Sequence, residues 1–441
     1  MHDDQELMSA VEALWGLSHP GPENLWSSQE FIVLQSLLGR RYGDAKTIFG
    51  IQLALGNALR SLGLPCLHPR QDRYQPLDLQ KVVSDLVQAF TTKRVLRRHM
   101  CPLDLADDLP PLCFGSAKVG RFPPEELEIF FDAPRLARHF PDIPLDSRKL
   151  SQFHWLVVEE EVDGVGSPTS RALPFLEMDV RADLGEIDPH GSRLPAVVES
   201  ALFFLLLAPW EQWAEMRQVD WRGFHLPWIY TVSDDLCESP KKPPDPATLS
   251  WQPGFYTDEQ GETVELDEPV ALFLNNGAAH GLKALTDSAW NTLQAARQTG
   301  LFNTPVEHFL VRAFLAKGMD EVLSHITAIE AALGMRVDHD SSRRPLVGAK
   351  NNPGATRRVA SRLSAAMNDP GAAKDYIKLF DIRSTFVHGR AGLAPISTEH
   401  RILARHLARG AASSLVTLAG LGDSRNRTLE RLLQNGFANL P

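Results

Sequence analysis

The chain has 441 residues, of which 43% are hydrophobic and 23% are charged, and its formal net charge is −10 at pH 7. This length and composition are typical of a globular protein with two or three domains, and they exclude the fibrous and disordered classes. Acidic residues predominate in residues 1–300, whereas Lys and Arg outnumber Asp and Glu in residues 301–441. This segregation favours a polyanionic partner for the C-terminal third, although an arginine-rich solvated helical surface would give the same counts.

The cysteines and the N-terminus indicate a reducing cytoplasm as the expected location. The four cysteines are sparse, and a chain of this size needs no disulfides for stability. The first residues are acidic and lack the basic and apolar parts of a signal peptide. The most apolar run, residues 201–210, is about half as long as a membrane span, so no membrane contact is expected.

Residues 1–90 are predicted to form a helical N-terminal region. Apolar residues recur at helical spacing in successive segments, and a further helix is expected at residues 77–90. The clearest apolar positions are Leu7, Val11, Leu14, Trp15, Phe31, Leu34, Leu37 and Leu38. The region shows no pattern of catalytic or binding residues.

Residues 91–280 are predicted to be a mixed α+β region with a sensor or regulatory role. Prolines interrupt its first part so often that long helices are not expected there. Three segments have strand composition, one apolar stretch indicates a buried helix, and one polar sequence indicates a hairpin turn. The strands are predicted at residues 154–158, 175–180 and 221–232, the helix at 197–208 and the turn at 258–261.

Residues 281–441 are predicted to form an antiparallel helical bundle, which makes the whole fold mainly α. Pro305 is expected at the start of one helix, and Asp320 and Thr398 are expected N-caps of two others. An apolar stripe along residues 322–333 indicates a helix that ends at Gly334.

One segment of this bundle, residues 380–389, reads Phe-Asp-Ile-Arg-Ser-Thr-Phe-Val-His-Gly and is predicted to be the end of a helix. Five apolar residues are expected to make contacts for this helix end: Ile377, Phe380, Ile382, Phe386 and Val387. Gly389 is expected to end the helix in the left-handed conformation, which glycine adopts without strain.

The same segment contains Arg383 and His388. A guanidinium and a titratable imidazole are the two group types that acid–base cleavage of a phosphodiester requires. The spacing alone is not specific, because it recurs at residues 94–99 and 401–406. On a regular helix, two side chains five positions apart point roughly 140° away from each other. A second copy of the chain could bring such groups together across a two-fold axis.

The sequence around Arg383 resembles the HEPN superfamily, and within it the Apea-like branch. The resemblance rests on the run Asp-Ile-Arg-Ser-x-x-Val-His-Gly at residues 381–389. Upstream of it lie Ala-Ile-Glu-Ala-Ala-Leu-Gly at residues 328–334 and an arginine-bearing helix at residues 357–367. The resemblance is specific from about residue 300 to residue 440.

The resemblance implies a helical domain that dimerises and builds a composite, metal-independent ribonuclease site from the Arg-x4-His motifs of both copies. Arg383 and His388 would be the catalytic residues. Ser384 stands at the polar position that directly follows the arginine. Glu330 matches an acidic position of the partner helix, where it would orient Arg383 or His388, unless it forms a plain surface ion pair. No metal and no cofactor are expected.

The expected function is therefore that of an endoribonuclease that cleaves RNA in antiphage defence or toxin-like growth arrest. The acidic upstream region would hold the nuclease inactive until an activating ligand or a phage component arrives. The alternative is a HEPN module without activity that binds RNA or a nucleotide and mediates dimerisation.

Two other groups of residues are weaker candidates. Cys66, His68, His99 and Cys101 have the ligand types for zinc but not the spacing of common zinc sites, so unrelated core or loop positions are the favoured interpretation.

A run of carboxylates favours a solvated acidic surface over a magnesium site: Glu177, Asp179, Asp183, Glu186 and Asp188. The sequence contains no glycine-rich phosphate loop, nucleophile elbow or dinucleotide fingerprint, which disfavours ATPases, serine hydrolases and dehydrogenases.

Overall fold

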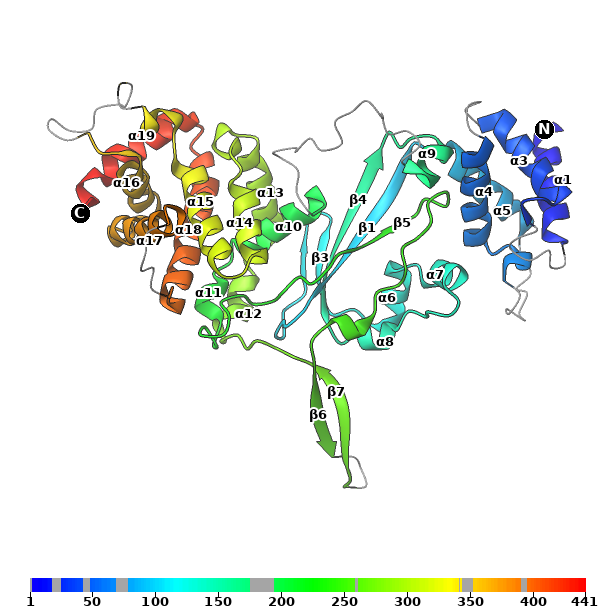
Figure 1. The fold of residues 1–441 in the computed structure, drawn as a ribbon, viewed down its shortest axis with the longest axis horizontal. Coiled ribbons are helices and arrows are strands. Elements are labelled where there is room, and N and C mark those ends of the chain that lie inside the picture. The colour runs from blue at the N-terminus through cyan, green and yellow to red at the C-terminus, as the bar shows by residue number, and fades with distance from the viewer. Residues whose placement is uncertain are drawn as a thin grey trace.

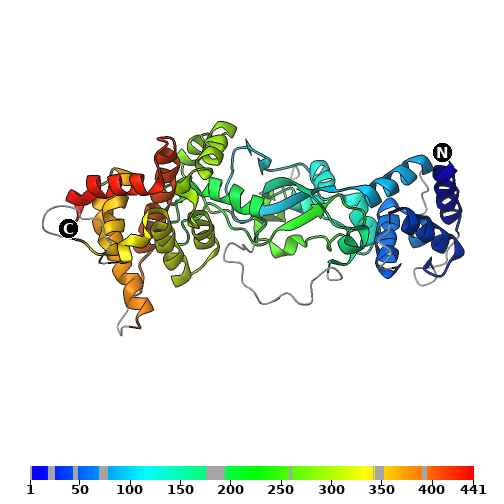
Figure 2. The ribbon, with the colours of Figure 1, turned by 90° about the horizontal axis from the view of Figure 1, so that it is seen from above.

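The computed structural model describes residues 2–17, 25–42, 48–68, 78–174, 194–257, 261–340, 342, 352–389 and 395–441. The chain is elongated, with the N-terminal helices at one end, a β-sheet in the middle and the C-terminal helices at the other end (Figures 1 and 2). The mainly helical fold with a mixed α+β part is the one predicted. No helix in these ranges combines the length and the apolar character needed to cross a membrane.

The N-terminal helices pack around a core of their own. Apolar side chains at helical spacing, such as Leu7 and Val11, are buried there as predicted. The last of these helices begins where the Asp78 carboxylate accepts hydrogen bonds from the backbone N–H groups of Gln80 and Lys81. The helices are α1 (His2–Trp15), α3 (Gln29–Tyr42), α4 (Ile48–Leu62) and α5 (Leu79–Thr91).

The main sheet of the described residues has five antiparallel strands in the order β2-β3-β4-β1-β5. Helix α10 (Ala196–Leu206) packs on one face. Three short helices lie at the other face: α6 (Pro124–Phe130), α7 (Ala133–His139) and α8 (Ser147–Leu150). The strands are β1 (Arg94–Leu103), β2 (Leu112–Phe114), β3 (Ala117–Gly120), β4 (His154–Asp163) and β5 (Tyr230–Ser233).

Strand β4 shows how the sheet serves two cores. Successive side chains of a strand point to opposite faces. Leu156 and Val158 therefore join the core that contains α10, whereas Trp155 and Val157 join the core formed with α6 to α8. Short helices α9 (Pro168–Ala172) and α11 (Trp210–Trp213) connect the sheet to the two helical ends of the molecule.

A β-hairpin extends away from the body of the molecule (Figure 1). It consists of β6 (Trp251–Thr257) and β7 (Thr263–Pro269), which pair in antiparallel register. Gly261 lies in its turn with a φ of +85°, a conformation that favours glycine. The predicted hairpin is thus confirmed.

The C-terminal helices form the predicted bundle, and its core is continuous with the α10 face of the sheet. The contact runs through α10 and α14, which pack against each other. The helices are α12 (Gly277–Leu282), α13 (Asp287–Arg297), α14 (Val306–Leu315), α15 (Met319–Leu333), α16 (Ala355–Met367), α17 (Gly371–Val387), α18 (Thr398–Ala419) and α19 (Arg425–Gly436).

Several local predictions differ from the structure. Most of residues 221–232 is irregular, because only its last three residues belong to β5. Helix α15 follows Gly318, so Asp320 lies in its first turn and is not the N-cap. Ser397, one residue before the predicted Thr398, caps α18 by accepting a hydrogen bond from the His400 N–H. The predicted strand at 175–180 lies outside the described residues.

Candidate functional site

The Arg383 motif lies at the C-terminal end of α17, as predicted. Arg383 and Ser384 are in the last turns of the helix, and His388 is its C-cap. The His388 N–H donates to the Ser384 carbonyl at 3.1 Å, and Gly389 follows with a φ of +61°. The left-handed glycine ends the helix, so His388 stands at its rim and not inside the bundle.

Arg383 lies beside Glu330, which is contributed by the neighbouring helix α15. The Arg383 Nη2 and Glu330 Oε2 atoms are 3.8 Å apart, and the two side chains are 33% and 31% exposed. The guanidinium carbon also lies 5.3 Å from the centre of the Phe380 ring, one turn earlier on α17. The arginine is thus held against the bundle while part of its guanidinium stays open to solvent.

His339 and Tyr376, which were not predicted from the sequence, belong to the same cluster. Burial raises the pKa of the Glu330 carboxyl, and the charges of Arg383 and His339 counteract part of this effect. Tyr376 lies two turns before Arg383, is fully buried, and its hydroxyl has no hydrogen-bond partner among the described residues. Burial and the Glu330 charge raise the pKa of Tyr376 well above its ordinary value, against the effect of Arg383.

The structure does not bring His388 to Arg383 within one chain. Its side chain is exposed and makes no hydrogen bond or ion pair with any residue that the structure describes. Ile377, Phe380 and Ile382 pack against the core as predicted. For Phe386 and Val387 the prediction was wrong, because the last turn of α17 leaves them 46% and 54% exposed among the described residues.

Several arginines of the bundle are used inside it. Arg362 is fully buried and donates to Asp338 (Nη2 to Oδ1, 2.9 Å). Arg425 donates to three main-chain carbonyls at the end of α15. Arg405 is also fully buried and faces Glu211 across the contact with α11. Part of the excess of basic residues therefore has a structural explanation, and the excess does not by itself indicate a polyanion-binding surface.

The two other Arg-x4-His spacings are structural. Arg401 donates to the buried Glu321 carboxylate at 2.9 Å, and the His406 Nδ1 atom lies 3.6 Å from a Glu211 oxygen. Arg94 pairs with Asp163 at 2.7 Å at the edge of the sheet. The side chains of these pairs thus form ion pairs within the fold, whereas His388 on α17 forms none with any described residue.

The four zinc-like residues lie in different places. Cys66 is buried in the N-terminal core, whereas Cys101 is buried in the core shared by the sheet and the bundle. His99 contacts Thr231 and Glu160 instead of a cysteine. These residues therefore do not form a metal site. The acidic run from Glu177 to Asp188 lies outside the described residues.

Comparisons with known proteins give no match: no family model, no curated protein and no solved structure is similar to this chain.

Proposed function

We propose that the chain is a metal-independent endoribonuclease of the HEPN type, and that two copies build its active site. The observation that carries this proposal is the arrangement on α17. Arg383 is held beside Glu330 with part of its guanidinium open, and His388 is exposed one turn further on. The biological role that the resemblance suggests is antiphage defence or toxin-like growth arrest.

The geometry of a single chain favours a dimer as the active species. Arg383 and His388 diverge around the helix, and no described residue links them. Phe386 and Val387 directly precede His388 and expose apolar surface at the same helix end. Burying them against a second α17 would remove this surface from water and bring the two motifs to one cleft.

The chemistry assigned to these groups is transphosphorylation. The 2′-oxygen of the RNA attacks the adjacent phosphorus, its proton is removed, and the bond to the 5′-oxygen breaks. The products are a 2′,3′-cyclic phosphate and a 5′-hydroxyl. His388 of one copy or the other takes the 2′-proton or protonates the leaving 5′-oxygen. Arg383 donates hydrogen bonds to the non-bridging oxygens as negative charge grows on them.

A second candidate function is RNA binding without cleavage. Glu330 favours it, because a carboxylate beside Arg383 partly neutralises the charge that would stabilise the transition state. A module of this kind needs the arginine for its phosphate contact but does not need His388.

Two variants separate these candidates. If the protein is a ribonuclease, His388→Ala abolishes cleavage of a labelled single-stranded RNA. The affinity of this variant for the RNA, measured by fluorescence anisotropy, stays within about threefold of wild type. Arg383→Ala weakens binding by roughly tenfold, the value of a charge-assisted hydrogen bond. His280→Ala, an exposed histidine on α12, is the matched control and keeps full activity. Cleavage at the wild-type rate by both motif variants would overturn the assignment of this site.

The dimer is tested separately. The double variant Phe386→Ser and Val387→Ser is expected to shift the protein from dimer to monomer in sedimentation velocity and to lose cleavage with it. Leu421→Ser removes another exposed apolar side chain, at the loop between α18 and α19, and it should leave the dimer intact. A double variant that remains dimeric and active would contradict the interface.

A further inference from the structure

A cavity of about 470 Å³ opens at β5, the edge strand of the main sheet. It lies between the sheet and residues 238–241, on a part of the chain distinct from α17. Its volume is within the range of about 300–1,000 Å³ that is usual for small-molecule sites. Its polar lining includes Arg97, His99, Glu160, Thr231, Ser239 and Lys241.

Two of the cations that line this cavity are unpaired. The Arg97 guanidinium makes no hydrogen bond or ion pair with any described residue, although Glu160 stands directly opposite Arg97 in the β1–β4 ladder. Glu160 instead approaches His99, with its Oε2 atom 3.3 Å from Nε2. The Lys241 ammonium is also without a partner among the described residues, while its main-chain carbonyl accepts a hydrogen bond from Tyr230.

Apart from the Glu238 carboxylate, the remaining charged groups of the lining have partners. Arg135 is buried and donates to the carbonyls of Ser233, Asp235 and Glu238, so its guanidinium is used by the fold. The Asp132 carboxylate accepts from the Arg135 N–H at the start of α7. The Glu238 carboxylate adds one negative charge. The groups left to bind a ligand are therefore mainly two cations and the hydroxyls of the lining.

The start of α10 adds donors to the same cavity. Pro195 and Ala196 line it, and no described side chain caps this 11-residue helix, whose N-cap residue is Pro195. Free N–H groups and the positive end of a helix both favour an anion. This feature agrees with the two unpaired cations, which carry the argument.

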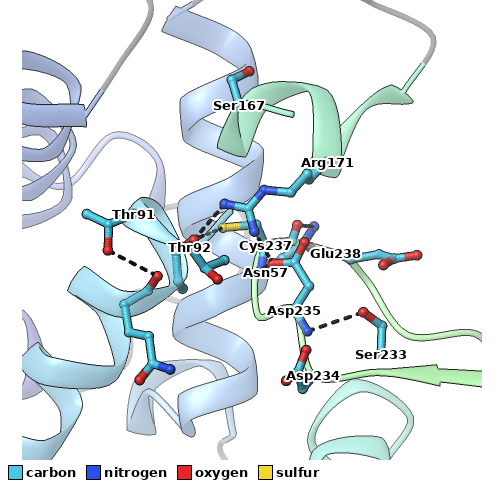
Figure 3. A network of polar contacts seen from close by, with 12 residues as sticks. Asn57, Thr91, Thr92, Ser167, Arg171, Ser233, Asp234, Asp235, Cys237 and Glu238 are labelled. Atoms are coloured by element: carbon cyan, nitrogen blue, oxygen red, sulfur yellow. Dashed lines mark hydrogen bonds and ion pairs between the residues drawn. The ribbon is translucent and has the colours of Figure 1, made fainter. Parts of the chain in front are cut away.

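The wall that contains Lys241 is tied to the N-terminal helices. Figure 3 shows Arg171 of α9 reaching Asp235, with Arg171 Nη1 and Asp235 Oδ1 2.6 Å apart. Arg171 also donates to the Ala89 carbonyl of α5, and Asn57 of α4 donates to the Cys237 carbonyl at 2.9 Å. A ligand held by Lys241 would thus contact a segment that is anchored only a few residues away to the N-terminal core.

We propose that this cavity binds the phosphate group of a small phosphorylated ligand between Arg97 and Lys241. A phosphate dianion accepts hydrogen bonds from a guanidinium fork and an ammonium group, and it compensates both unpaired charges. The rest of the cavity has room for a group of about the size of a nucleoside. The site is independent of the ribonuclease proposal, because none of its residues belongs to the α17 cluster.

Isothermal titration calorimetry tests this site in the full-length protein. The probes are inorganic phosphate and the four nucleoside 5′-monophosphates. Wild type is expected to bind at least one of them, and Arg97→Ala and Lys241→Ala are each expected to weaken that binding by roughly tenfold or more. Tighter binding of one nucleotide than of phosphate shows that the base is recognised, and equal binding shows that the phosphate alone is. Either result supports the site.

Two controls make the result specific. Lys242→Ala removes the neighbouring exposed lysine, which does not line the cavity, and is expected to bind like wild type. Arg383→Ala is also expected to bind like wild type, because phosphate at α17 would be a different site. Circular dichroism confirms folding, and Arg97→Gln and Lys241→Gln replace any alanine variant that fails to fold. The proposal is overturned if wild type binds none of the probes, if both cavity variants bind like wild type, or if only Arg383→Ala loses binding.

Discussion

Glu330 positions Arg383 through a weak ion pair. It comes from α15, more than fifty positions before Arg383, and it lies 3.8 Å from the guanidinium. Because both side chains are about one third exposed, the attraction between them is weak and screened by salt. Glu330 therefore holds Arg383 in place without binding it so tightly that an RNA phosphate could not replace it.

Glu330→Gln is expected to increase RNA affinity, because the phosphate then no longer competes with a carboxylate for Arg383. The increase should be about two- to fivefold, the value of a partly exposed ion pair. Fluorescence anisotropy at fixed ionic strength measures it. Glu430→Gln, which removes an exposed carboxylate of α19, should leave affinity unchanged. Equal or lower affinity of Glu330→Gln would show that the carboxylate helps binding instead of opposing it.

Part of this site could be predicted from the sequence. The helix end, the left-handed Gly389 and the place of Arg383 and His388 on it follow from local pattern. Tyr376 was missed, although it lies seven positions before Arg383 and so on nearly the same face of the helix. His339 could not have been found, because its approach to Glu330 depends on how the chain folds back after α15.

At the scale of elements, a buried carboxylate joins α11 to α18. Glu211 of α11 contacts three side chains of α18: the Arg409 Nε atom at 2.9 Å, Arg405 at 3.4 Å and His406 at 3.6 Å. Burial alone would raise the pKa of Glu211, but the His406 contact and the charges of Arg405 and Arg409 lower it to about 2. The carboxylate thus stays ionised and ties α11 to α18 of the bundle.

Glu211→Gln is expected to destabilise the protein by about 3–5 kcal/mol, because it leaves the fully buried Arg405 without a counter-charge. Urea unfolding measured by circular dichroism provides the value. Asp163→Asn is the control, since it breaks an exposed pair with Arg94 and should not shift the midpoint. A change as small as that of the control would show that the carbonyls of Leu206 and Ala208 satisfy Arg405 alone.

Strand β1 was not predicted, and its neighbours explain why. Its first half is rich in Arg, which is unusual for a central strand. In the fold these charges meet an acidic run on β4: Arg94 pairs with Glu161 and Asp163, and Arg98 pairs with Glu159. The pairing joins segments about sixty residues apart. Helices were easier to predict because their apolar period is written within one segment.

For the whole molecule, the elongated arrangement separates the N-terminal core from the α17 site, with the sheet between them (Figure 1). The sheet and the bundle share one core, whereas the N-terminal helices have their own. If the N-terminal half regulates the bundle, the signal passes through the sheet and across its contacts with the bundle. These contacts include the packing of α10 on α14 and the buried ion pairs of Glu211 and Glu321 with α18.

Acid is expected to destabilise the whole molecule well before its carboxylates are protonated. Burial lowers the pKa of His139 to about 3 and that of His154 to about 4, and it lowers the pKa of His325 well below its ordinary value. The unfolded chain takes up these protons near the ordinary histidine pKa of about 6.5. Between about pH 7 and about pH 5 the unfolded state therefore binds more protons than the folded state. The free energy of unfolding decreases as the pH is lowered through this range. Burial raises the pKa of Asp234 and Glu330, which reduces this slope without reversing it.

Urea midpoints across this pH range measure the effect. His154→Gln should flatten the slope, because glutamine can still accept a hydrogen bond from the Leu109 N–H but does not titrate. Stability that is constant from about pH 7 to about pH 5 would show that water reaches these histidines in solution.

The central claim is that α17 carries a ribonuclease site that needs no metal. Its most direct test is cleavage of a labelled single-stranded RNA in the presence of EDTA by wild type, His388→Ala and the control His280→Ala at matched purity. We predict that wild type and the control produce fragments with 2′,3′-cyclic phosphate ends and that His388→Ala produces none. Chelator-resistant cleavage that persists in His388→Ala, or wild-type products that end in a 3′-hydroxyl, would contradict the account.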